Sequence, residues 1–236
     1  MTTDKDGFSD LVLEKDFDLV LEKTGLTRGE IVARFGGAVD ISGSMGLAFA
    51  NGSVGRCLEI LSVPASRFDD DGNLEIIAYN DKAHPLPDVT SQNVKGYVTR
   101  NTIGGLHIGG WTLFAPILDA FMNRWFPKKG GFLGMGGKPD VSGGLAYLCL
   151  ITDGVFEDEN DRRRATEIIE AAQSLPVFIQ IVGIGVDEST FAPWLKLPNV
   201  DWISADSVEE LVKNPTALYE HLLSQKVCDF YKSHKK

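Results

Sequence analysis

The sequence contains few cysteines, only three among 236 residues: Cys57, Cys149 and Cys228. They are widely separated, form no CxxC pair and have no histidine at the spacing of a metal finger. This pattern argues against a disulfide framework and against a structural zinc site. A reducing cytoplasm is the compartment that best suits such a chain.

Long hydrophobic runs are also missing. The longest nearly apolar stretch is VFIQIVGIGV, well short of the ~20 residues that a membrane-spanning helix needs. The first ten residues, MTTDKDGFSD, lack the basic and then apolar order of a signal peptide. We therefore expect neither a membrane span nor secretion.

Positive charge is scarce relative to negative charge. The chain has 23 lysines and arginines against 33 aspartates and glutamates, which gives a net charge of −10. Such a surface is unsuited to holding nucleic acid or an anionic membrane by general electrostatics. With 43% hydrophobic residues, the chain can nevertheless bury the substantial core of an ordinary globular protein.

Apolar segments alternate with helical patterns from about residue 33 onward, which is typical of a parallel sheet covered by helices on both faces. The expected strands are 33–41, 73–80, 145–152, 176–184 and 199–204, and the expected helices are 54–68, 91–100, 114–125, 159–174 and 207–226. Pro64 should kink or split the first helix, because proline cannot donate the helical hydrogen bond. The sequence thus predicts an α/β fold whose first strand lies near the middle of the sheet.

Two segments fall outside this alternation. Residues 1–32 are mixed and charged, and we interpret them as an amphipathic lead-in segment to one domain at 33–230. The glycine-rich stretch 127–144 is expected to be a long loop outside any element. Its GGK resembles the end of a phosphate-binding loop, but Lys138 is followed by Pro139 and not by serine or threonine. We therefore interpret the stretch as a flexible loop and not as a phosphate-binding loop.

Oxygen-bearing side chains gather where predicted strands end. The stretch AVDISGSMG places Asp40, Ser42 and Ser44 at alternate positions after an apolar strand. Asp153 follows the buried strand LAYLCLI, and Thr112 precedes a predicted helix. Ligands of open parallel sheets bind beyond the carboxyl ends of the strands, and Mg²⁺ prefers hard oxygen donors. Together these five residues favour a metal site.

Each of these residues also has a purely structural interpretation. Ser42, Ser44 and Thr112 are suited to capping the helices that follow them, and Asp153 with Gly154 is suited to a turn.

The motifs resemble those of a von Willebrand factor A domain, and in particular its bacterial tellurium-resistance branch, the TerF type. The similar stretches are LEKTGL, DISGSM, RFDDDGNLEIIAYNDKAHPLPDVT, YLCLITDG, VFIQIVGIG and LYEHLL, which together span about 20–230. The resemblance implies a Rossmann-like, mostly parallel sheet with one short antiparallel edge strand, and a metal-ion-dependent adhesion site on its rim.

The same resemblance implies a role for each candidate residue. Ser42 and Ser44 would coordinate Mg²⁺ or Mn²⁺ directly, and Thr112 would join them when a ligand is bound. Asp40 and Asp153 would hold coordinated waters or bind directly. An open coordination position would then accept an acidic group of a protein partner.

We therefore expect a cytoplasmic, metal-dependent protein-binding module that is not an enzyme, in the setting of tellurium resistance or stress response that the resemblance implies. The alternative is a magnesium-dependent phosphohydrolase with Asp40 as its nucleophile. That chemistry commonly needs a second acid two residues later, where Ser42 stands, and a lysine near the phosphate.

Overall fold

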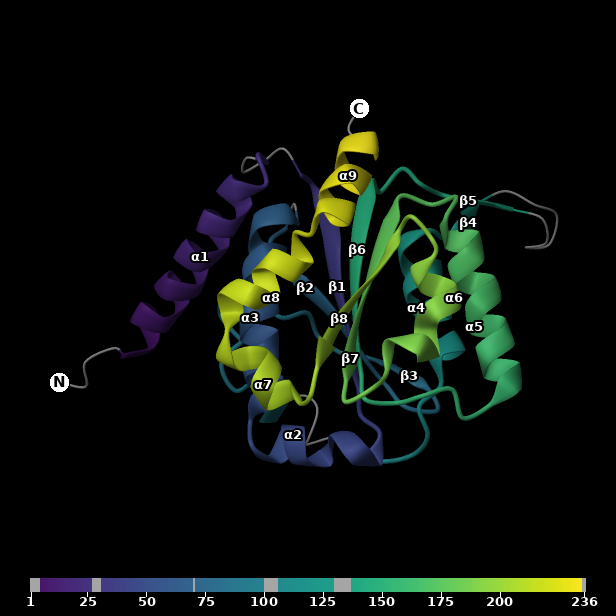
Figure 1. Cartoon of the computed structure of the whole chain (residues 1–236), viewed down its shortest axis with the longest axis horizontal. Helices are drawn as coiled ribbons and strands as arrows, with labels where there is room; N and C mark the ends of the chain where they lie inside the picture. The colour runs from purple at the N-terminus through teal and green to yellow at the C-terminus, as the bar shows by residue number, and fades with distance from the viewer. Residues whose placement is uncertain (1–4, 27–30, 70, 100–105, 130–136, 235–236) are drawn as a thin grey trace.

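The computed structural model describes residues 5–26, 31–69, 71–99, 106–129 and 137–234. Its centre is a six-stranded sheet in the order β3-β2-β1-β6-β7-β8 (Figure 1). All neighbouring strands are parallel except β3, which runs antiparallel to β2 at the edge. The strands are β1 (Ala33–Asp40), β2 (Leu74–Tyr79), β3 (Ala83–Pro85), β6 (Leu145–Thr152), β7 (Val177–Ile184) and β8 (Val200–Ala205). The predicted α/β fold and the central place of the first strand are confirmed.

Helices cover both faces of this sheet. α3, α7 and α8 lie on one face with α1 outside them, and α4, α5 and α6 lie on the other (Figure 1). Their side chains form one apolar cluster on each face. The helices are α1 (Lys5–Lys23), α2 (Gly46–Ala50), α3 (Ser53–Phe68), α4 (Phe114–Trp125), α5 (Glu159–Ala172), α6 (Ala192–Leu195), α7 (Val208–Lys213), α8 (Pro215–Leu222) and α9 (Gln225–His234).

Two helix predictions are wrong. The stretch 207–226 is not one helix, because Asn214 and Pro215 end α7 and begin α8, and a further break precedes α9. Within 91–100 the described residues form turns, with helical backbone only at 97–99. There the Asn93 side chain bonds the backbone of Thr90 and Asp88, and such bonds compete with helix formation.

The glycine-rich stretch is not entirely without secondary structure. β4 (Lys128–Lys129) and β5 (Lys138–Pro139) pair antiparallel in a separate two-stranded sheet, which corrects the prediction of a loop at those positions. The intervening residues 130–136 lie outside the described residues.

The N-terminal helix α1 packs against α8 and α3. Its residues Leu13, Phe17 and Leu21 are buried, and the ring of Phe17 meets those of Phe68 and Tyr219 edge-on. Part of the predicted lead-in segment therefore contributes to the apolar cluster on this face of the sheet.

None of the described helices combines the length and the apolar character that a membrane crossing requires.

Pro64 does not split α3, which runs continuously from Ser53 to Phe68. Proline has no N–H to bond the carbonyl of the residue four positions earlier, here Ile60. The buried hydroxyl of Tyr219, on α8, donates a hydrogen bond of 3.2 Å to that carbonyl. The Tyr219 hydroxyl thus replaces the missing helical hydrogen bond to Ile60. The predicted break of α3 at Pro64 does not occur.

We expect Tyr219→Phe to destabilise the protein by about 1 kcal/mol, because it leaves the buried Ile60 carbonyl without a donor. Chemical denaturation measures the change. In a Pro64→Ala background the restored N–H can serve the carbonyl, so the same substitution should cost much less. Equal costs in the two backgrounds would show that the hydroxyl does not compensate for Pro64.

Candidate functional site

The carboxyl ends of β1 and β6, where Asp40 and Asp153 stand, lie at the same edge of the sheet as α2, which is at the lower end of the view in Figure 1. Asp40 ends β1, and the 3₁₀ turn η1 (Gly43–Met45) begins three residues later. β6 is the neighbour of β1, with Val39 paired to Ile151. Parallel pairing in this register brings Asp153, just past the end of β6, next to the turn after β1.

The carboxylate of Asp40 is the centre of a hydrogen-bond network. Its Oδ1 accepts the backbone N–H of Ser42 at 2.8 Å. Its Oδ2 accepts the hydroxyls of Thr112 at 3.2 Å and Thr152 at 2.9 Å. Asp40 is fully buried. Three separate segments of the chain therefore meet at this one side chain.

A second set of contacts joins the two serines to Asp153. The hydroxyls of Ser42 and Ser44 are 3.1 Å apart, and they donate to Oδ1 of Asp153 at 3.3 and 2.9 Å respectively. The structure thus brings together all five residues singled out in the sequence, as a cluster of two carboxylates and three hydroxyls.

The interpretation of these residues as helix caps fits the observed hydrogen bonds less well. Ser42 precedes η1 but makes no side-chain cap. Thr112 is not the N-cap of α4, a position held by Leu113, and its hydroxyl points to Asp40. The hydroxyls are therefore directed toward the carboxylates and not toward helix ends.

The electrostatics of the cluster are unfavourable to two negative charges. Burial raises the pKa of Asp40, hydrogen bonds from Ser42 lower it, and the nearby Asp153 raises it. No lysine, arginine or histidine of the described residues pairs with either carboxylate. A divalent cation bound among these oxygens would offset both the burial and the repulsion, so the donor set fits such an ion.

Sequence reasoning missed Thr152 and Asp161. Thr152 is the last residue of β6, and its hydroxyl donates to Asp40 at 2.9 Å and accepts the N–H of Gly154 at 3.0 Å. Asp161, on α5, accepts the N–H groups of Phe114 and Ala115 at 2.9 and 2.8 Å, and so holds the start of α4 just after Thr112. The first was visible as a polar residue in ITDG, whereas the second needed the tertiary contact.

Gly154 is required by the close approach of two loops. A Cβ at this position would lie 2.6 Å from both Cβ and Oγ1 of Thr112, a distance that side chains do not adopt. The absence of a side chain at Gly154 therefore lets Thr112 come close to the end of β6 and reach Asp40.

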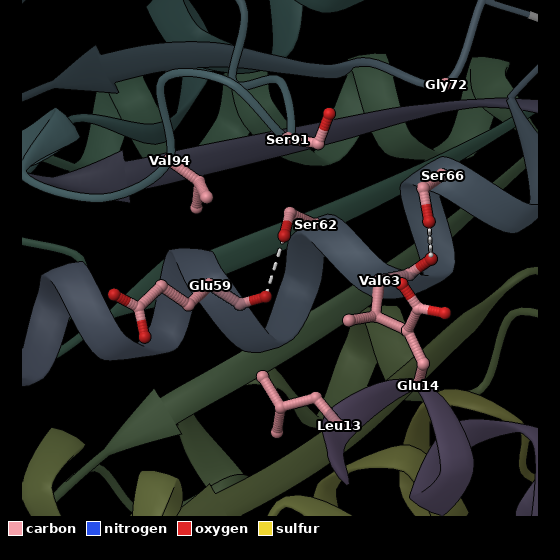
Figure 2. Close-up of a pocket in the computed structure, with 9 residues that line it drawn as sticks. All are labelled: Leu13, Glu14, Glu59, Ser62, Val63, Ser66, Gly72, Ser91 and Val94. Atoms are coloured by element: carbon pink, nitrogen blue, oxygen red, sulfur yellow. Dashed lines mark hydrogen bonds between the residues drawn. The ribbon is translucent and has the colours of Figure 1, made fainter. Parts of the chain in front are cut away.

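Another hollow, of about 110 Å³, lies between α1, α3 and the segment around Ser91 (Figure 2). Four of its five polar side chains are engaged within the protein. Ser62 and Ser66 donate to carbonyls of their own helix, and Glu14 and Glu59 pair with arginines. Its lining therefore offers far less ligand chemistry than the Asp40 cluster.

Comparisons with known proteins agree with the fold. The chain is 27% identical over 220 residues to the uncharacterized protein YcbR of Bacillus subtilis (strain 168), covering 90% of this chain and 82% of that one. Among solved structures, proximal thread matrix protein 1 of the mussel byssus matches with a TM-score of 0.57 at 13% identity, over 82% of this chain. The match spans 48% of that chain, about half its length.

The manganese-loaded TRAP protein of Plasmodium vivax matches with a TM-score of 0.50 at 16% identity, over 79% of this chain and 74% of that one. The family described as "vWA found in TerF C terminus" matches residues 32–227, which is most of the chain and includes every residue of the cluster. The chain therefore belongs to the TerF-like family of von Willebrand factor A domains.

Proposed function

We propose that this chain is a protein-binding domain whose binding depends on Mg²⁺ or Mn²⁺ held by Asp40, Ser42, Ser44, Thr112 and Asp153. One observation carries the proposal: two carboxylates and three hydroxyls from three loops converge without a basic side chain of the described residues to neutralise them. Domains of the vWA type commonly bind partners at a site of this kind, which supports the proposal.

The chemistry of the donors explains how such a site would bind a partner. Hydroxyls are neutral, so much of the charge of a bound divalent ion would remain available to an incoming carboxylate. Asp40 is held by three hydrogen bonds inside the protein, and Ser44 is exposed at the rim. The partner would therefore approach from the side of the serines and Thr112 and present an acidic residue.

The same donors suit either Mg²⁺ or Mn²⁺, since both ions accept carboxylate and hydroxyl oxygens. The fold neighbour from Plasmodium vivax is described as manganese-loaded, which supports testing both ions.

For the cellular role we propose tellurium resistance or stress response, on the basis of membership in the TerF-like family. The three cysteines are all free and buried, which supports a cytoplasmic site of action.

The phosphohydrolase alternative is less well supported by the geometry. Both oxygens of Asp40 already accept hydrogen bonds, and the side chain is fully buried. A nucleophile needs a lone pair directed at the substrate. Ser42 occupies the place of the second acid, and no described lysine contacts the cluster.

Calorimetric titration of the chain with Mg²⁺ and with Mn²⁺, combined with a pull-down in the presence of each ion or of chelator, tests the proposal. We expect saturable binding of one ion per chain and partner capture that chelator abolishes. Absence of ion binding, or capture that is equal with and without chelator, would contradict it.

A further inference from the structure

Each of the three segments of the chain that carry the candidate site also exposes one large apolar side chain, which for the first segment lies in α2. Leu47 follows Ser44 by three residues, Trp111 precedes Thr112, and Val155 follows Asp153 by two. Their exposed fractions are 76%, 60% and 49%. We call these three residues the apolar rim. Exposed apolar groups repeated beside a binding site are typical of a surface that a partner covers.

The backbone that presents Trp111 is firmly attached to the sheet. Gly109 donates its N–H to the carbonyl of Ile41 at 2.8 Å, and its own carbonyl accepts the amide of Asn80 at 2.8 Å. On the other side of Trp111, the N–H of Leu113 bonds the carbonyl of Asn80 at 3.0 Å. A large aromatic side chain is therefore held outside the core on anchored backbone. Tryptophan in such a position loses little freedom on binding and is the residue type most enriched at binding hot spots.

The apolar surface continues beyond Trp111. A hollow of about 780 Å³ there is lined by the apolar residues Trp111, Leu113, Ala115 and Pro116 and by the polar residues Asp119, Asp158, Asn160, Asp161, Arg163 and Arg164. Its arginines, Arg163 and Arg164, pair with Glu167 and Asp119. Because these charges are matched within the protein, this side of the site offers apolar contact and little excess positive charge.

The opposite side of the site is acidic. A hollow of about 260 Å³ between α2 and α7 contains Leu47, Asp153, Asp206 and Glu209. Glu209 pairs with Lys213 at 3.8 Å, whereas Asp206 has no ionic partner among the described residues, and the whole chain carries a net charge of −10. A partner with many acidic residues would be repelled here, whereas one with a single acidic residue and nearby basic groups would be attracted.

We propose that the apolar rim is a docking surface for a protein segment in which one acidic residue lies between large apolar side chains, in an otherwise neutral or basic context. The inference rests on the proposed function, since the acidic residue would reach the metal ion. The flanking apolar side chains would cover Leu47, Trp111 and Val155. The basic groups would lie toward Asp206, the acid of this hollow that has no ionic partner among the described residues.

Synthetic peptides with blocked ends test this specificity. The probe is Lys-Gly-Leu-Asp-Leu-Gly-Lys, compared with a version containing Asn in place of Asp and a version containing Glu in place of both Lys. Binding is followed in Mg²⁺ by anisotropy of a labelled peptide and by protection of tryptophan fluorescence from acrylamide. Trp125 and Trp194 are buried and Trp202 is half-buried, so the signal is compared with that of Trp111→Ala to isolate the contribution of Trp111. We expect the probe to bind at least tenfold more tightly than either comparison peptide.

Substitutions separate the apolar rim from the metal site. Trp111→Ala and Leu47→Ser should each weaken binding of the probe at least tenfold, without changing the rise in melting temperature that Mg²⁺ produces. Leu19→Ser is the matched control, because Leu19 is similarly exposed, at 58%, but lies on α1; it should leave binding unchanged.

Several results would overturn the inference. Probe binding that is unaffected in Trp111→Ala, or equal for the Glu-containing peptide, contradicts the docking surface. A retained Mg²⁺ shift without binding of the probe overturns the apolar rim but leaves the proposed metal site standing, whereas a missing shift contradicts the proposed function itself. A Mg²⁺-dependent dimer that Trp111→Ala abolishes, seen by ultracentrifugation, would make a second copy the occupant.

Discussion

Asp40→Asn is expected to abolish the stabilisation of the protein by Mg²⁺ and, in chelator, to make the protein more stable than the parent. Asparagine keeps the shape of Asp40 and can still accept the N–H of Ser42. It removes a charge that burial disfavours, as the raised pKa of Asp40 indicates, and that is repelled by Asp153. The same change removes a charged ligand that a divalent ion requires.

The expected size follows from mass action. An ion that binds only the folded chain stabilises it by about 2.7 kcal/mol at a concentration of 100 times the dissociation constant. Thermal denaturation in Mg²⁺, Mn²⁺ and chelator measures this gain for the parent and for the variant. We expect the full gain in the parent and none in Asp40→Asn.

A matched control is Asp229→Asn on α9, at the opposite end of the sheet. Asp229 accepts a hydrogen bond from Gln225 on the exposed surface of the helix. This variant should keep the whole response to Mg²⁺. If Asp40→Asn still gains stability from Mg²⁺, the ion binds elsewhere and the cluster is only a structural network.

Much of the sheet was predictable because its central strands are buried on both sides. β6 and β7 consist almost entirely of buried apolar residues, and a run of that kind has few alternatives to a central strand. The candidate site followed from the same logic, since parallel strands end at one edge. Asp40 and Asp153, which are far apart in sequence, meet because β1 and β6 are neighbours.

The errors arose where tertiary contacts decide the local structure. Pro64 was expected to break α3, but the Tyr219 hydroxyl that replaces the lost bond comes from a helix 155 positions further along the chain. In the sequence, Asp161 is one of several acidic residues at the start of a predicted helix. In the structure its side chain also accepts the first N–H groups of α4. Periodicity describes one segment at a time and carries no information about such partners.

Gly36 and Gly37 of β1 are a further case in which a tertiary contact decides the residue type. Judged from the sequence alone, glycine inside a strand only weakens it. In the structure Gly36 faces α4, and the rings of Phe121 and Trp125 occupy the space where a side chain would lie. A Cβ on Gly36 would be 2.6 Å from carbons of both rings. Since Phe121 and Trp125 are themselves buried, neither ring can move aside without disturbing the packing of the helix.

We therefore expect Gly36→Ala to destabilise the protein by about 1 to 3 kcal/mol, the usual cost of overpacking a core, even though alanine is the better strand and helix former. Urea denaturation at fixed Mg²⁺ measures the loss. Gly46→Ala is the matched control, because a Cβ there meets nothing within 4 Å and lies in helical backbone, so it should be neutral or slightly stabilising. Equal stability of the two variants would show that α4 adjusts to the added methyl group. A selective loss in Gly36→Ala would show that close approach of α4 to β1, the strand that carries Asp40, selects glycine at this position.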